Sequence, residues 1–332
     1  MNTFGEIFRF TDFGESHGVA VGGVIDGCPA GVAVNFDEIQ TELDRRAGRS
    51  GDFCEFVSER AKDEQDTVEW LSGLQEGVTL GTPIAFLVRN KEHKSTDYAA
   101  FREVYRPGHA DYTYERKYGI RAVCGGGRAS ARETVARVVA GAIAGQILRS
   151  YGVLVRSSIT QIGDATGFED MKALLQAVRA EGDSIGAIVR TSVSGLPVGV
   201  GEPVFDKLAA RLAYAMLSIN ACKGFSYGSG FAGVGRRGSE LNDPMPFSTN
   251  HAGGMLGGIS NGQEVCFDVV FKPTPSIRQI QQTIDVKGQS REICVRGRHD
   301  VCVAIRAVPV VEAMTALALL DMCLLAEVFK KK

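Results

Sequence analysis

Apolar residues recur at helical spacing in several segments of the chain. The most regular segment follows three consecutive glycines, Gly125 to Gly127, and its apolar positions share one face: Val135, Val138, Val139, Ala142, Ile143 and Ile147. Ser130 and Glu133 have the S-x-x-E spacing of a capping box before this helix, and Gly152 marks its end. The same periodicity predicts helices over residues 36–46, 168–181, 203–219 and 309–329.

Shorter apolar runs have the character of strands. They cover residues 19–25, 83–89, 185–193 and 264–272, and the last of them alternates and is rich in β-forming residues. Strands and helices are mixed without a regular βαβ rhythm. The pattern therefore predicts an α+β fold rather than a doubly wound parallel sheet.

Two of these strands lead into similar turns. The sequence GCPAGV at 27–32 precedes Phe-Asp and an apolar helical pattern, and GLPVGV at 195–200 does the same. Each copy has the order strand, Gly-Pro turn, helix. Two copies nearly half a chain apart indicate a duplicated unit, although such turns can also be alike by chance. Because no linker separates the halves, we expect residues 1–332 to form a single domain.

Composition narrows the class of protein. The net charge of −2 and a pI near 6.3 argue against nucleic acid as the main partner. Eight cysteines without a close pair are typical of a reduced compartment. The chain contains neither an H-E-x-x-H nor a C-x-x-C motif, so we expect no metal site. No signal peptide is seen, and the longest charge-free stretch of the last helix, 313–320, is too short to span a bilayer. We expect a soluble, cytoplasmic protein with no membrane partner.

The glycine run and its surroundings predict an anion site. Residues 102–137 contain eight Lys or Arg against four acidic residues. Three glycines that open a helix present free N–H groups at its positive end, with Arg128 and Arg132 beside them. This combination suits a phosphate or another oxyanion.

Two histidines in loops suit proton transfer. His17 lies between glycines in GESHG, 14–18, and His109 lies in the basic segment before the glycine run. A histidine in such a loop has little packing around it and titrates near neutral pH, which weakens the alternative of a buried structural role. Further basic loops contain Arg45 and Arg46, Lys272, and Arg298. If these loops converge, they would fit a ligand with several phosphates and carboxylates.

Six motifs, in order over nearly the whole chain, resemble the chorismate synthase family: GESHG at 14–18, RPGHAD at 106–111, GGGRASARET at 125–134, SINACKG at 218–224, NHAGGMLGGISNG at 250–262 and RHDVCVAIRAVPVVEAM at 298–314. The resemblance implies a layered β-α-β sandwich with an internal pseudo-two-fold repeat, assembled as a homotetramer. It implies the 1,4-anti elimination of phosphate from 5-enolpyruvylshikimate 3-phosphate, which gives chorismate. The family requires reduced FMN without net oxidation and is associated with NADP. Since no flavin-reductase domain is attached, we expect an external source of reduced flavin.

The resemblance also implies roles for individual residues. His17 would donate a proton near the reduced flavin, His109 would protonate the departing phosphate, and Asp300 would help the flavin take the ring proton. Ser16 and Ser130 would support these groups. The FMN contacts would be Arg128, Ala129, Ser130, Asn220, Ala221, Gly257, Lys272, Pro273, Thr274, Pro275, Ser276 and Arg298. The substrate-binding arginines would be Arg45, Arg46, Arg106 and Arg132.

Some positions depart from the family pattern. Ala122 and Cys124 stand where an aspartate and an arginine are common, and Val301 replaces a proline. The region 49–67 is longer than usual, which leaves Arg49 only a candidate ligand contact.

Two functions of other classes stay open at this stage. An ATP-dependent small-molecule kinase would also use a glycine-rich loop, but the G-K-[ST] sequence and an acidic metal-binding cluster are missing. A non-catalytic protein that binds anions or nucleic acid is disfavoured by the net charge and by the paired loop histidines.

Overall fold

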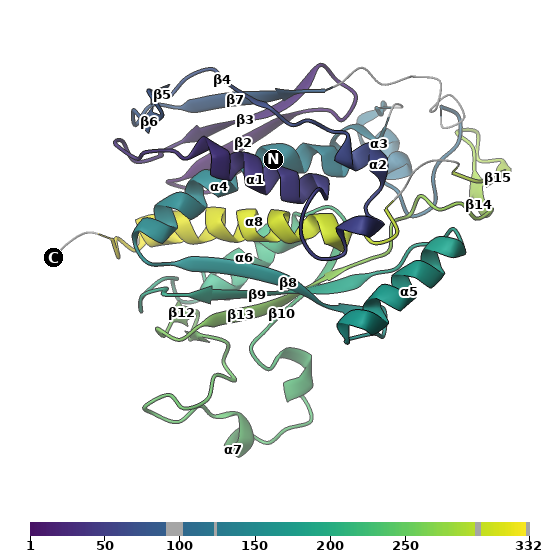
Figure 1. The fold of residues 1–332 in the computed structure, drawn as a ribbon. Coiled ribbons are helices and arrows are strands. Elements are labelled where there is room, and N and C mark those ends of the chain that lie inside the picture. Colours follow the sequence, from purple (N-terminus) through teal and green to yellow (C-terminus); the bar gives the residue numbers. More distant parts are fainter. Residues whose placement is uncertain (91–101, 123–124, 296–299, 330–332) are drawn as a thin grey trace.

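Two antiparallel sheets enclose a layer of helices in the computed structural model, which describes residues 1–90, 102–122, 125–295 and 300–329 (Figure 1). The first sheet has the order β1-β2-β3-β7-β4, with β1 Thr3–Phe4, β2 Arg9–Gly14, β3 Ala20–Asp26, β7 Ile84–Arg89 and β4 Val68–Trp70. The second has the order β10-β13-β9-β8, with β10 Cys222–Tyr227, β13 Val265–Phe271, β9 Ala187–Ser194 and β8 Leu154–Ile162.

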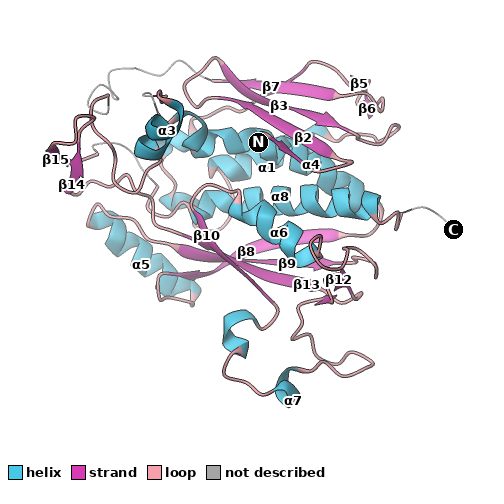
Figure 2. Ribbon diagram, turned by 180° about the vertical axis from the view of Figure 1, so that it is seen from behind, coloured by secondary structure: helices cyan, strands magenta, loops and turns pink. Residues whose placement is uncertain are grey.

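The helices between the sheets form the middle layer, which is seen from behind in Figure 2. They are α1 Phe36–Ala47, α4 Thr134–Ser150, α6 Leu208–Leu217 and α8 Ala304–Leu325. Helix α8 is long and apolar enough to cross a membrane, but 78% of its apolar window is buried inside the fold. A helix that is apolar all round is expected at the centre of a large core. The layered β-α-β sandwich of an α+β fold is therefore confirmed.

The internal repeat is confirmed by the order of the strands. In the first half β2, β3, β7 and β4 are neighbours in that order, and in the second half β8, β9, β13 and β10 repeat it. Helices α1 and α4 of the first half correspond to α6 and α8 of the second. Each half also carries a small hairpin, β5 Leu74–Gln75 with β6 Val78–Thr79, and β11 Met255–Leu256 with β12 Ile259–Ser260.

The repeated Gly-Pro turn is held in the same way in both halves. The buried Thr79 hydroxyl donates to Pro29 O at 2.6 Å and accepts from the Val32 N–H at 2.9 Å. Ser260 repeats both bonds at 2.6 and 2.9 Å, with Pro197 O and the N–H of Val200. Two identical hydrogen-bond pairs at matching positions indicate duplication rather than a chance similarity of turns.

The remaining elements lie at the ends and edges of the sandwich. They are α2 Glu59–Lys62, α3 Asp111–Tyr118, α5 Phe168–Ala180, α7 Gly238–Leu241, the hairpin β14 Gln281–Ile284 with β15 Ser290–Ile293, and the 3-10 turns Cys54–Phe56, Gly127–Ala129, Ala131–Glu133 and Gly230–Gly233. The segment 228–254, which includes α7, extends beyond the second sheet (Figure 1).

Two helices differ from the sequence-based prediction at both ends, since α6 also ends two residues earlier, at Leu217, and α8 four residues earlier, at Leu325. The helix predicted over 203–219 begins only at Leu208. The helix predicted over 309–329 begins five residues earlier and contains Pro309. Burial of Ala304, Ile305 and Ala307 in the core extends this helix upstream of the proline.

Candidate active site

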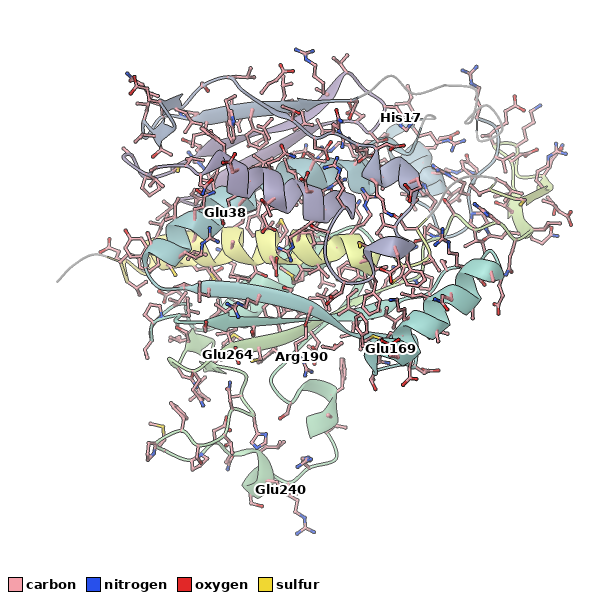
Figure 3. The ribbon with its side chains drawn as sticks, in the orientation of Figure 1. His17, Glu38, Glu169, Arg190, Glu240 and Glu264 are labelled. Carbon is pink, nitrogen blue, oxygen red and sulfur yellow. The ribbon has the colours of Figure 1, made fainter. Side chains whose placement is uncertain are left out.

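Loops from both halves enclose a cavity of about 510 Å³ at one end of the sandwich. This volume lies within the range of roughly 300–1,000 Å³ that is usual for small-molecule sites. Figure 3 shows His17 at the end of the first sheet that faces α3. The lining residues used below are Ser16, His17, Arg46, Glu64, Arg106, His109, Gly125, Ala129, Ser130, Arg132, Asn220, Ala221, Lys272, Thr274, Pro275, Ser276, Asp300 and Arg306.

The glycine run lies against both predicted catalytic histidines. A Cβ atom on Gly125 would lie 2.1 Å from Cε1 and Nδ1 of His17. One on Gly126 would lie 2.8 Å from Cε1 of His109. Both glycines have positive φ, 72° and 94°, a conformation that is costly for other residues. The run is therefore glycine because the backbone must touch two imidazole rings, which it brings into one cavity.

His109 belongs to a buried charged triplet. Its Nδ1 lies 2.8 Å from Asp111 Oδ1, and the Arg106 guanidinium donates from Nε and Nη2 to the same carboxylate at 2.7 Å each. Burial alone would raise the pKa of Asp111, but the hydrogen bonds from Arg106 and His109 outweigh it and hold that pKa well below the usual range. The ionised Asp111 carboxylate fixes the ring of His109, as the orienting group of a general acid should.

The serines of the two loops are placed differently. Ser16 is buried, and its hydroxyl lies 3.2 Å from Nδ1 of His17. Ser130 accepts from the Arg132 N–H at 3.3 Å, and a 3-10 turn over Ala131–Glu133 precedes α4. Ser130 therefore caps the helical segment as predicted, but Glu133 does not return the second bond of a capping box. Glu133 instead turns inward, where its carboxylate accepts from Arg137 Nε at 2.9 Å.

A second cluster pairs three arginines with three carboxylates. Arg132 donates to Asp66 at 2.5 Å and to Glu64 at 3.1 Å. The buried Arg46 donates to Ala131 O at 2.8 Å and to Asp66 at 3.3 Å. Burial lowers the pKa of Arg46 to about 10, and the neighbouring Arg306 adds to this effect.

Arg306 completes this cluster and holds Asp300. It donates to Asp300 Oδ2 at 3.2 Å, and the N–H of Ser58 donates to Oδ1 at 2.9 Å. Burial would lower the pKa of Arg306, but Asp300 and Glu64 outweigh it and raise that pKa. These carboxylates offset much of the positive charge of the segment 102–137. The sequence of that segment does not show this, because the carboxylates come from loops distant in the sequence.

Most of the residues expected to contact FMN line the same cavity, with exceptions given below. Asn220 donates from Nδ2 to Ala129 O at 3.2 Å, and its buried Oδ1 has no donor among the described residues. Lys272 donates to Gly108 O at 2.6 Å, and burial lowers the pKa of its ammonium group. Thr274 donates to Asp300 O at 3.2 Å, which ties this loop to the start of α8.

The structure does not bring every predicted residue to the cavity. Arg45 pairs with Glu42 and Glu312, each at 2.6 Å, and lines a separate groove between α1, α4 and α8. Arg128 does not line the cavity, because it pairs with Asp12 at 2.9 Å and donates to Gly14 O at 3.1 Å. Gly257 lies in the β11–β12 turn, away from the lining residues.

Further predicted ligand contacts lie outside the cavity lining or outside the described residues. Pro273 does not itself line the cavity, although its neighbours do. Arg49 pairs with Asp44 and donates to the backbone carbonyls of Lys62 and Glu64, so it stabilises the 49–67 region rather than facing the cavity. Arg298 and Cys124 lie outside the described residues.

Sequence reasoning missed Glu64, Asp66 and Arg306. Glu64 and Asp66 lie in the region 49–67, whose length is its only distinctive feature in the sequence. Arg306 lies in the motif at 298–314, and the sequence predicts no role for it. A signal was present in the excess of arginines, since buried guanidinium groups require acidic partners. Within the described ranges, no three or more His, Cys, Asp or Glu side chains gather to hold a metal ion.

Comparisons with known proteins agree in one family. The family model described as chorismate synthase matches residues 8–324. A chorismate synthase of Opitutus terrae is 50% identical over 352 residues, covering 96% of each chain. One of Porphyromonas gingivalis is 49% identical, covering 97% of this chain and 95% of its own. A crystal structure of a chorismate synthase superposes with a TM-score of 0.75 at 27% identity, covering 97% of this chain and 92% of the other.

Proposed function

The chain belongs to the chorismate synthase family, and on that premise we propose that its cavity binds reduced FMN and 5-enolpyruvylshikimate 3-phosphate together. Members eliminate phosphate from this substrate and give chorismate, the last step of the shikimate pathway. The observation that carries the proposal is the meeting of His17, His109 and the glycine run in one cavity with Asp300.

The residues of this cavity fit a flavin. Asn220 offers a buried oxygen without a donor, which suits an N–H group of the ligand. Lys272, Thr274 and Ser276 add an ammonium group and two hydroxyls to the lining of the cavity. We propose that these residues, with Ala129, Ser130, Ala221 and Pro275, hold FMN. Bound reduced FMN would lend electron density to the substrate transiently, without net oxidation.

The side chains of the cavity account for the movement of protons. His109, oriented by Asp111, would protonate the phosphate as it leaves, which stabilises the growing negative charge. His17 would donate a proton beside the flavin, with the Ser16 hydroxyl fixing its ring. Asp300, held by Ser58 and Arg306, would help to move the ring proton.

Cationic side chains would bind the substrate. Arg46, Arg106, Arg132, Lys272 and Arg306 line the cavity, and among the described residues Glu64 and Asp300 are the carboxylates that line it with them. Their charge suits a substrate with one phosphate and two carboxylates. Arg306 joins the substrate-binding set in place of Arg45, whose partners hold it in another groove.

We also propose that residues 1–332 are one domain, that the chain forms a cytoplasmic homotetramer, and that another protein supplies the reduced flavin. Assembly is supported by apolar side chains on the segment 228–254, where Phe231 is 84%, Val234 93% and Met245 78% exposed. Burial of these side chains against a second copy of the chain would remove their apolar surface from water. Sedimentation velocity tests the assembly, and a monomer at micromolar concentration would contradict it.

The flavin site is tested by removing the unpartnered oxygen. We expect Asn220→Leu to weaken FMN binding about tenfold or more, since a hydrogen bond in a buried site is worth about 1 kcal/mol and its unpaired partner costs more. Equilibrium binding measured by flavin fluorescence gives the dissociation constant. Asn242→Leu is the control, because Asn242 directly follows α7 and does not line the cavity. This variant should bind FMN as the wild type does. Equal affinities for both variants would place the flavin elsewhere.

A further inference from the structure

Two buried carboxylates, Asp12 and Glu133, interact with each other and take no part in the chemistry proposed above. Asp12 lies on β2 and is 6% exposed, and Glu133 precedes α4 and is 1% exposed. Asp12 Oδ2 and Glu133 Oε1 are buried, and neither accepts a hydrogen bond from a described residue. A buried carboxylate oxygen without a donor is costly, so two of them in contact need a proton between them.

The other oxygens of the pair hold two arginines. Asp12 Oδ1 accepts from Arg128 at 2.9 Å, and Arg128 also donates to Gly14 O at 3.1 Å. Glu133 Oε2 accepts from Arg137 at 2.9 Å, and Arg137 reaches the Ser218 hydroxyl at 2.8 Å. Arg137 Nε lies 3.8 Å from Asp12 Oδ2, too far to serve as its donor.

We propose that Asp12 and Glu133 share one proton, and that this pair is a positioning device that fixes Arg128 and the carbonyl of Gly14. Gly14 opens the loop that carries Ser16 and His17, and Arg128 lies between the three glycines and two cavity residues, Ala129 and Ser130. The shared proton therefore sets the position of both loops that meet at His17.

The charges around the pair support one proton rather than none. Asp12 and Glu133 face Arg128 and Arg137, with Glu15 the next carboxylate near Arg128. The pKa of Glu133 is raised to about 8, mainly by burial. The nearby Arg137 offsets only part of the effect of burial, and Asp12 raises the pKa further. With one shared proton the four groups carry a net charge of +1 behind an anion-binding cavity. Loss of that proton cancels this charge and sets two carboxylates against each other.

The pair makes ligand binding depend on pH, and this consequence rests on the proposed function. The probe is FMN, and its dissociation constant is measured by fluorescence from pH 7 to pH 9.5. The wild-type constant should rise above about pH 8, by up to tenfold per pH unit if only the protonated pair binds the anion.

Two variants and a control distinguish the pH dependence caused by Asp12 and Glu133 from that caused by other titrating groups. Glu133→Gln keeps a donor toward Asp12 at every pH, so the rise of its FMN dissociation constant should shrink to the part that deprotonation of the partly buried Lys272 contributes. Asp12→Asn removes the charge that holds Arg128, and should weaken FMN binding about tenfold or more already at pH 7. Glu38→Gln makes the same chemical change on α1 at a carboxylate that pairs with Arg149, and should keep the wild-type slope. A wild-type constant without the rise, or a Glu133→Gln variant that retains it in full, overturns the proposal.

Infrared spectroscopy tests the proton without any variant or ligand. The apo wild type should show a protonated carboxyl band at pH 7 that shifts on ¹³C-glutamate or ¹³C-aspartate labelling and disappears by about pH 9.5. Absence of this band at pH 7 would refute the shared proton even if chorismate forms. Its presence in a protein that binds no FMN would instead refute the proposed function and leave the pair standing.

Discussion

At the scale of single residues, the two loop histidines differ in what fixes them. His17 has the Ser16 hydroxyl at 3.2 Å, whereas His109 has the ionised Asp111 at 2.8 Å. A carboxylate attracts the N–H of an imidazole ring more strongly than a hydroxyl does. This difference agrees with a general acid for the phosphate at His109 and a flavin-side proton donor at His17.

We therefore expect His17→Ala and His109→Ala each to lower turnover by roughly 10²–10⁴, the span of a general acid. Loss of His109 should also remove the kinetic requirement for a protonated group near neutral pH, whereas loss of His17 should alter the spectrum of bound reduced FMN. Anaerobic pH–rate profiles and flavin titrations measure both effects. His251→Ala, beside Ser229 and away from the cavity, is the control. Near-normal turnover in either catalytic variant would leave that histidine a structural role only.

At the scale of elements, the glycine run joins two loops that the sequence separates. Its place before a helix was predictable from the periodicity of residues 135–147, and so was its need for close approach. What approaches it was not predictable, because His17 reaches Gly125 only through the pairing of β2 with β3 and the packing of both on α4.

This contact predicts the effect of one added methyl group. Gly125→Ala would place Cβ 2.1 Å from the His17 ring at a φ of 72°. We expect it to reduce turnover about as much as His17→Ala does, because the ring must leave its position. Gly119→Ala is the matched control, since Gly119 has a φ of 71° and nothing within 4 Å of its Cβ. Both variants carry the same backbone strain, so comparable activity in the two would show that the contact with His17 does not matter.

The repeated turns supply a second prediction at this scale. Thr79→Val and Ser260→Ala each remove the hydroxyl that bridges a partly exposed Gly-Pro turn. Each should lower the free energy of unfolding by about 0.5–1.5 kcal/mol, the usual net contribution of a hydrogen bond. Because the two turns belong to separate sheets, the losses should add in the double variant. Urea denaturation followed by circular dichroism measures them, and a loss in only one half would show that the turns are not equivalent.

At the scale of the whole molecule, the repeated turn and the mixture of elements were enough to predict the fold class. The strands β2, β8 and β10 escaped prediction because polar residues interrupt their apolar pattern, as Arg156 and Ser158 do in β8. The site was predicted through local motifs, which include the histidines, the glycines and most flavin contacts. The carboxylates around the site were not predicted from the sequence. Asp12 pairs with Arg128, and Glu64 and Asp66 pair with Arg132, and in each pair the two residues are more than 60 positions apart in the sequence.

The central claim is that this cavity converts 5-enolpyruvylshikimate 3-phosphate to chorismate with reduced FMN. Anaerobic incubation of the full chain with substrate and dithionite-reduced FMN, followed by chorismate absorbance, tests it directly. We expect chorismate and phosphate to form in equal amounts over many turnovers, without stoichiometric consumption of the flavin. Turnover with oxidised FMN alone, or no chorismate under strictly anaerobic reducing conditions, would contradict it.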